Sequence, residues 1–173
     1  QIEKWTDDGL RVLLLAEFND NDTPLKSLKP GSGRPLAVVL LRNLLRDGVV
    51  DTVAFLQRQG VNIRVISGDN PRTVQYVARA AGINNPDTAI TGAELAELDE
   101  PAFATAADQH TIFARVLPEQ KERLIAHFSQ QKHQFTGMVG DGVNDALALK
   151  KADLGVAMYA GAPASRRVAD IIL

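Results

Sequence analysis

Two aspartates lie in a glycine-rich run, Gly140-Asp141-Gly142-Val143-Asn144-Asp145, which has the residue types of a metal or phosphate site. The apolar stretch before it, Phe135 to Val139, is long enough for one buried strand, and Ala146 to Lys151 after it predicts a helix. Asp141 therefore falls where a parallel strand ends, which is where open α/β sheets bind their ligands.

Each residue type in this run suits a different part of such a site. Asp141 offers a hard oxygen ligand to Mg²⁺, and Gly140 and Gly142, which have no Cβ, let backbone N–H groups come close to an anion. Asp145 would begin the helix, where unpaired N–H groups and the helix dipole favour a carboxylate. The alternative is a plain Gly-Asp-Gly turn in which Asp145 only caps the helix.

Two other groups could complete a phosphate site. Ser67-Gly68-Asp69 follows a predicted strand, and Lys121 lies in the first turn of a helix that begins at Pro118. A phosphoryl group in transfer needs a hydroxyl or backbone donor on one oxygen, a fixed cation on another and a metal to neutralise the rest. Ser67, Lys121 and Mg²⁺ on Asp141 could supply all three, although Ser67 alone fits a turn serine and Lys121 alone a solvated lysine.

Alternating strands and helices are predicted around these groups from apolar periodicity and from capping residues such as Asn70-Pro71 and Thr91 with Glu94. The predicted strands are Leu36 to Leu41, Val61 to Ser67, Thr111 to Val116, Phe135 to Val139, Leu154 to Met158 and one near Ile171. The predicted helices are Asp47 to Gln59, Asn70 to Gly82, Thr91 to about Leu98, Pro101 to Asp108, one from Pro118, Ala146 to Lys151 and a short one through Val168. Strands joined by single helices predict an α/β fold with a doubly wound parallel sheet.

The amino-terminal part is less regular. Gly9 to Ala16 is apolar enough for a buried element, but it is too short for periodicity to choose between helix and strand. Asn19 to Pro35 is polar and rich in Asp, Pro, Gly and Ser, which predicts a loop or a hinge between units.

Composition limits the classes of function. The chain has 173 residues, 45% of them hydrophobic, and a net charge of −2, which suits one α/β domain with an appended piece. No cluster of Lys and Arg exceeds two neighbours, so neither nucleic acid nor an anionic membrane surface is an evident partner. No run approaches the roughly 18 apolar residues of a spanning helix, and cysteine is absent. The chain starts at Gln1 without an initiator Met, so we expect a soluble piece of a longer protein.

Three motifs together resemble the phosphorylation domain of P-type cation-transporting ATPases, which has the haloacid dehalogenase-like, Rossmann-type fold. They are Ile66-Ser67-Gly68-Asp69-Asn70, Phe113 to Lys121, and Val139 to Leu149. The match runs from about Leu36 to Leu173, whereas residues 1–35 resemble the tail of a nucleotide-binding domain and its hinge. We therefore expect two domains, 1–35 and 36–173.

The resemblance implies a role for each matching residue. Asp141 would bind Mg²⁺, Ser67 and Lys121 would hold the phosphoryl group, and Asn144 and Asp145 would support that site. The residues expected to lie towards the nucleotide, ATP, are Arg11, Gly68, Asp69 and Arg115. The whole protein would phosphorylate itself on aspartate from ATP and couple hydrolysis to movement of a cation through membrane helices, with this part on the cytoplasmic face.

The sequence departs from the family's pattern at several positions. Serine replaces the usual threonine at Ser67, Leu147 stands where a proline is usual, Asn43 stands where an aspartate is usual, and Gly161 to Arg167 matches loosely. The family's nucleophile is an aspartate in an Asp-Lys-Thr-Gly-Thr stretch, and no such stretch occurs in this chain. The fragment by itself is therefore expected to be inactive.

The missing segment would end a strand between those that carry Val65 and Met138, so the sheet should be incomplete at its centre. We expect the gap to close by direct pairing of these two strands, or by a strand borrowed from within the chain or from a second copy, which would give a dimer. Two other functions fit the motifs: a soluble phosphatase of the same superfamily, and a non-catalytic α/β module that binds nucleotide or a partner protein.

Overall fold

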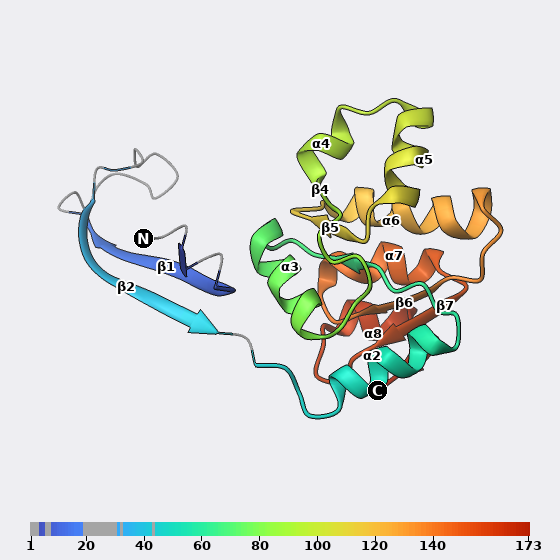
Figure 1. The fold of residues 1–173 in the computed structure, drawn as a ribbon, viewed down its shortest axis with the longest axis horizontal. Coiled ribbons are helices and arrows are strands. Elements are labelled where there is room, and N and C mark those ends of the chain that lie inside the picture. The colour runs from blue at the N-terminus through green and yellow to red at the C-terminus, as the bar shows by residue number, and fades with distance from the viewer. Residues whose placement is uncertain (1–3, 6–7, 19–30, 32, 43) are drawn as a thin grey trace.

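The computed structural model describes residues 4–5, 8–18, 31, 33–42 and 44–173. The predicted loop or hinge from Asn19 to Pro35 lies mostly outside these residues, as does Asn43. Figure 1 shows an amino-terminal hairpin joined by a short linker to a larger α/β unit.

The hairpin consists of β1 (Leu10–Glu17) and β2 (Arg34–Arg42), which pair in antiparallel register with Leu10 opposite Arg42. Gly9 to Ala16, whose type the sequence left open, is thus mainly a strand. The strand predicted from Leu36 to Leu41 also forms, but its partner is β1 and not a parallel strand of the α/β unit. The boundary predicted after residue 35 stays a prediction, and β2 begins at Arg34, just before it.

The α/β unit alternates short strands with helices, as predicted, except that the strand from Ala89 to Thr91 was not predicted because three residues are too few for an apolar period to show. Its strands are β3 (Val65–Ile66), β4 (Ala89–Thr91), β5 (Ile112–Ala114), β6 (Gly137–Gly140), β7 (Leu154–Ala157) and β8 (Ile171–Ile172). Its α-helices are α2 (Val49–Arg58), α3 (Pro71–Ala80), α4 (Gly92–Ala96), α5 (Glu100–Gln109), α6 (Pro118–Ala126), α7 (Ala146–Lys151) and α8 (Pro163–Val168). A π-helical turn (His127–Gln131) continues α6, and a 3-10 turn (Val143–Asp145) precedes α7.

Capping residues start α3 and α4 where the sequence predicts. The Asn70 carboxamide oxygen accepts a hydrogen bond from the N–H of Arg72 at 3.0 Å, and Pro71 takes the first helical position of α3. Thr91 and Glu94 form the predicted capping box of α4. Every helix in the described part of the chain is too short or too polar to cross a membrane.

The strands form two parallel three-stranded sheets, ordered β3-β5-β4 and β6-β7-β8. The doubly wound parallel pattern predicted from the sequence is therefore confirmed, and its centre is incomplete. The main core lies among β4, β5 and helices α4 to α6, with Phe103, Phe113 and Leu124 fully buried. A second core joins α6 to β6 and α7 through Ile125, Met138 and Leu149.

The gap between the two sheets stays open, which corrects the expectation that β3 and β6 would pair directly or through a strand from within the chain. Closure by a strand from a second copy stays a prediction. Among the described residues β3 pairs only with β5, β6 pairs only with β7, and no third strand joins them. Val65 and Ser67 donate their N–H groups to β5, so the polar groups of Ile66 between them face the gap. The sheets are instead connected by packing, because Ile66 contacts both cores.

The open edge also explains why β3 is short. Val61 to Ile63 alternate as a strand would, but the ladder begins only at Val65. A strand with a partner on one side has half the hydrogen bonds of a central strand to hold it extended. On the other side of the gap Val139 is 64% exposed and Phe135 80% exposed, and β6 begins only at Gly137.

Asp108 at the end of α5 anchors the π-helical turn. Its carboxylate accepts hydrogen bonds from buried His127 at 3.0 Å and from Lys132 at 2.9 Å. These two donors, chiefly His127, hold the pKa of Asp108 below its usual value. A carboxylate with a lowered pKa stabilises the folded state above its unfolded pKa of about 4, and this stabilisation is lost as the pH falls through the folded pKa.

We therefore expect Asp108→Asn to lower the thermal stability most at neutral pH, with the difference from wild type shrinking as the pH falls below about 4. Thermal unfolding followed by circular dichroism from neutral pH down to about pH 2 measures this. Asp51→Asn, which removes an exposed carboxylate on α2, controls for the loss of charge. If the melting temperatures of wild type and Asp108→Asn differed by the same amount at every pH, the Asp108 carboxylate would not be the source of the pH-dependent stability.

Candidate phosphate and metal site

Lys121 forms a buried ion pair with Asp145. Its amine lies 2.7 Å from Asp145 Oδ1, and the two side chains are only 10% and 11% exposed. Pro118 and the hydrogen bond from the Leu117 N–H to Gln120 Oε1 fix the first turn of α6, which carries Lys121. Lys121 is therefore not the solvated lysine that its position in a first helical turn alone would suggest.

The Asp145 side chain does not cap α7, which sets aside the interpretation of Asp145 as a plain helix cap. Its side chain makes no cap hydrogen bond to that helix, and it turns back to accept the N–H of Gly142 at 3.0 Å. A Cβ on Gly140 would lie 2.6 Å from the Cβ of Asp145, so glycine is required at 140 to make room for this carboxylate. The space that the sequence assigned to an external anion at Gly140 is thus occupied by Asp145.

Asp141 lies one residue beyond β6 and its side chain is exposed. No hydrogen bond or ion pair involves its carboxylate within the ranges that the structure describes, and Asn144 on the same loop is also exposed. These ranges contain no cluster of three or more His, Cys, Asp or Glu that could enclose a metal. One free carboxylate beside open space fits Mg²⁺, which keeps several waters and uses one or two carboxylates together with substrate phosphates.

Ser67, Asp69 and Arg115 form a second group, at the carboxyl ends of β3 and β5. Ser67 Oγ accepts the N–H of Asp69 at 3.1 Å, as in a turn serine, and its own hydrogen remains available for donation. The N–H of Arg115 donates to the carbonyl of Asp69 at 3.2 Å. Arg115 has a φ of 51°, a left-handed conformation that non-glycine residues seldom adopt and that recurs at functional sites.

The hairpin reaches this second group. The Arg11 guanidinium on β1 lies 4.0 Å from the carboxylate of Asp69, and Gly9 contacts the ring of Tyr76 on α3 so closely that a Cβ there would lie 2.1 Å from it. Gly68, the remaining residue of this turn, is exposed. Three residues predicted to face the nucleotide, Arg11, Asp69 and Arg115, are therefore neighbours.

The two groups do not touch. In the described part of the chain no hydrogen bond joins Ser67 to Lys121 or Asp141. Ser67 and Asp69 line a hollow of about 170 Å³ between β3 and α3 whose walls do not include Lys121 or Asp141. The groups thus lie on opposite sides of the open gap, Ser67 after β3 and Asp141 after β6.

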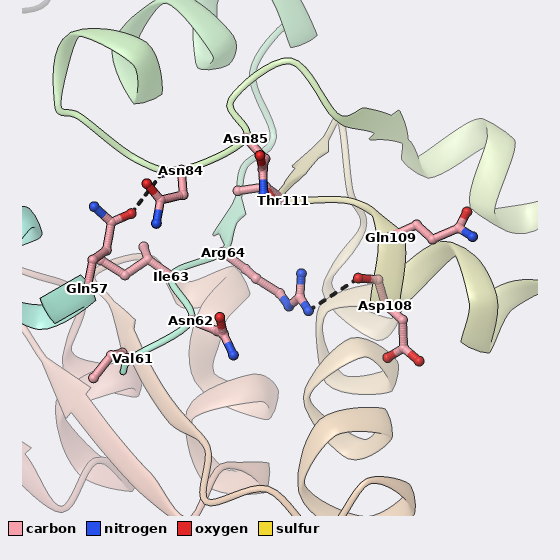
Figure 2. Close-up of a pocket in the computed structure, with 10 residues that line it drawn as sticks. All are labelled: Gln57, Val61, Asn62, Ile63, Arg64, Asn84, Asn85, Asp108, Gln109 and Thr111. Atoms are coloured by element: carbon pink, nitrogen blue, oxygen red, sulfur yellow. Dashed lines mark hydrogen bonds between the residues drawn. The ribbon is translucent and has the colours of Figure 1, made fainter. Parts of the chain in front are cut away.

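A polar cavity of about 180 Å³ lies at the other ends of the strands, where residues 61–64 lead into β3 and Thr111 into β5. Figure 2 shows Arg64 in this cavity, donating to the carbonyl of Asp108, while the Asp108 carboxylate points away from it. Arg64 also donates to the carbonyl of His110 at 2.7 Å, so it caps the carboxyl end of α5. This arrangement is structural and remote from the predicted site.

Sequence reasoning missed the segment that supports the Asp141 loop. The N–H of Ala162 donates to the carbonyl of Asp141 at 2.7 Å, and the hydroxyl of fully buried Ser165 donates to the carbonyl of Gly142. Both residues belong to the stretch from Gly161 to Arg167 that matches the family pattern only loosely. The sequence gives no signal for this role, because the burial of a serine is visible only in the structure.

Residues 3–153 match the family of haloacid dehalogenase-like hydrolases, and the chain belongs to that family. The calcium-transporting ATPase CtpE of Mycobacterium tuberculosis is 40% identical over 173 residues, which is 100% of this chain and 21% of that protein. The probable cation-transporting ATPase exp7 of Streptococcus pneumoniae is 35% identical over 95% of the chain and 21% of that protein. Calcium-transporting ATPase 1 of Lactococcus lactis is 35% identical over 100% of the chain and 20% of that protein. The chain thus spans about a fifth of the length of each of these three relatives.

Proposed function

We propose that the chain is the Mg²⁺- and phosphate-binding part of an ATP-driven cation pump that passes through an aspartyl-phosphate. The observation that carries this proposal is the buried pair of Lys121 and Asp145 directly behind the exposed loop of Asp141. Burying a lysine is costly unless it is paired, and here its partner Asp145 also holds the loop that carries the exposed carboxylate of Asp141. The names of the similar proteins support the same class of function.

Each residue has a distinct task in this proposal. Asp141 holds Mg²⁺, which when bound neutralises charge on the phosphoryl group in transfer. Lys121 contributes a positive charge, Ser67 donates its hydroxyl hydrogen to a phosphoryl oxygen, and the exposed amide of Asn144 lies on the loop beside them. Asp145 holds the amine of Lys121 in place through the hydrogen bond between them, and it accepts the N–H of Gly142.

The nucleotide would approach from the side of the hairpin. Arg11 and Asp69 form a loose contact at 4.0 Å with both side chains about half exposed, so either can exchange the other for a ligand. ATP phosphates would attract the guanidinium of Arg11, and Gly68, Asp69 and Arg115 surround the same point. Two of the three relatives described above are named for calcium, so Ca²⁺ is the first cation to test with the whole protein.

The open gap between β3 and β6 is the place we assign to the strand that carries the nucleophilic aspartate. A strand there would pair with the free groups of Ile66 on one side and β6 on the other, and its carboxyl end would emerge between Ser67 and Asp141. The phosphoryl group on that aspartate would then lie between the group of Ser67 and the group of Asp141. As a cation pump, the whole protein would be a membrane protein with these residues on its cytoplasmic side.

The test compares this chain with a longer one from the same gene that includes an upstream Asp-Lys-Thr-Gly-Thr. We expect labelled ATP and Mg²⁺ to give a hydroxylamine-sensitive acyl-phosphate on the longer chain, and Asp141→Ala to reduce the label to background because the charge of the phosphoryl group is then not neutralised. This chain alone should acquire no label.

Stable labelling of this chain that survives Asp141→Ala would refute the proposal. Turnover of para-nitrophenyl phosphate by this chain alone would favour the soluble phosphatase instead, since that reading requires a nucleophile within these residues. A parent gene without hydrophobic spans on both sides of this segment would favour the non-catalytic module.

A further inference from the structure

Ser165 is the most deeply buried polar side chain among the described residues. It lies on α8 with 0% exposure, and its hydroxyl donates to the carbonyl of Gly142, which lies 23 residues earlier in the loop between β6 and the 3-10 turn. A hydroxyl is costly to bury unless it is hydrogen-bonded, and its one donor is aimed at the loop that carries Asp141.

The loop is held from three directions. Asp145 Oδ2 accepts the N–H of Gly142 at 3.0 Å, and the N–H of Ala162 donates to the carbonyl of Asp141 at 2.7 Å. The carbonyl of Gly142 accepts two hydrogen bonds, one from the N–H of Asp145 at 3.0 Å within the 3-10 turn and one from Ser165. The peptide planes on the two sides of Gly142 are thereby fixed, and the carboxylate of Asp141 is left free.

We infer that Ser165 is a positioning residue that sets the direction of the Asp141 carboxylate for Mg²⁺ through the carbonyl of Gly142. This inference rests on the metal role given to Asp141 in the proposed function. The 3-10 turn keeps one hydrogen bond to the same carbonyl when Ser165 is replaced, so the turn survives but its orientation is less fixed. Groups that orient metal ligands in this way affect metal affinity more than they affect the fold.

The experiment uses Ser165→Ala, which removes only the hydroxyl, and Ser165→Cys, which keeps a weak donor. Ile112→Val is the matched control, because Ile112 is equally buried but lies in β5 of the other sheet. Without metal, NMR measures the carbonyl carbon shift of Gly142 and the exchange rate of its amide. We expect both to change in Ser165→Ala, by less in Ser165→Cys, and not in Ile112→Val.

Mg²⁺ is then titrated while the amide resonances of residues 140–144 are followed. Ser165→Ala should raise the dissociation constant about tenfold, with Ser165→Cys in between and Ile112→Val unchanged. A dissociation constant for Ser165→Ala equal to that of wild type would overturn the inference, as would an unchanged Gly142 carbonyl shift and amide exchange. If wild type shows no Mg²⁺-dependent shift, the proposed role of Asp141 fails, while the metal-free data still decide whether Ser165 holds the loop.

Discussion

Replacing Lys121 with methionine is expected to lower the free energy of unfolding by about 3 kcal/mol. The substitution keeps the length and much of the volume of the side chain, so the loss comes from the charge. Asp145, whose side chain is 11% exposed, would be left as a buried carboxylate with only the N–H of Gly142 as a partner. Urea unfolding followed by circular dichroism measures the difference.

The control removes both charges together. The double variant Lys121→Met with Asp145→Leu should recover most of the lost stability, since two apolar side chains can replace a buried ion pair at little cost. Asp145→Leu also removes the acceptor of the Gly142 N–H, so recovery should be incomplete. A loss of under about 1 kcal/mol in Lys121→Met would mean that the pair behaves as a solvent-exposed salt bridge.

The second large effect is expected at Gly140, where alanine should cost about 2 kcal/mol of stability through overpacking. The new Cβ would lie 2.6 Å from the Cβ and 2.9 Å from the Cγ of Asp145, and neither atom can retreat while Asp145 holds Lys121. We therefore expect Gly140→Ala also to weaken the ion pair. The same urea unfolding experiment measures the loss of stability.

Gly137→Ala is the matched control on the same strand. A Cβ at Gly137 meets nothing closer than the carbonyl oxygen of Leu154 at 3.9 Å, which is an ordinary contact. Its stability should stay within about 0.5 kcal/mol of wild type. Equal losses in the two variants would show that β6 itself, and not the position of Asp145, is sensitive to a side chain.

Short-range signals in the sequence predicted the local structure well. Asn70 with Pro71, and Thr91 with Glu94, begin helices because their side chains bond to backbone groups only two or three residues away. The Gly-Asp-Gly run was placed at a strand end for a similar reason, since apolar runs and glycines mark where an element stops. These signals also placed Ser67, Lys121 and Asp141 at the ends or starts of elements.

Contacts between residues far apart in the sequence could not be predicted from such short-range signals. The burial of Lys121 depends on Asp145, which lies 24 residues later, and lysines are seldom buried without such a partner. The support of the Asp141 loop by Ser165 depends on a hydrogen bond between α8 and Gly142, which lies 23 residues earlier. Tertiary packing alone brings these pairs together.

The sequence by itself determined the family and, apart from β4, the order of strands and helices in the α/β unit, because each depends on neighbouring residues or on a specific motif. The residues that would bind Mg²⁺ and phosphate stay a prediction from the same motifs. Only the tertiary structure decided that β2 pairs with β1 and that the gap between β3 and β6 stays open. The physical reason for the open gap is α6, whose adjacent residues Leu124 and Ile125 belong to the two different cores. The helix therefore holds the two sheets in place by packing, and the strand edges on either side of the gap remain available for a partner strand.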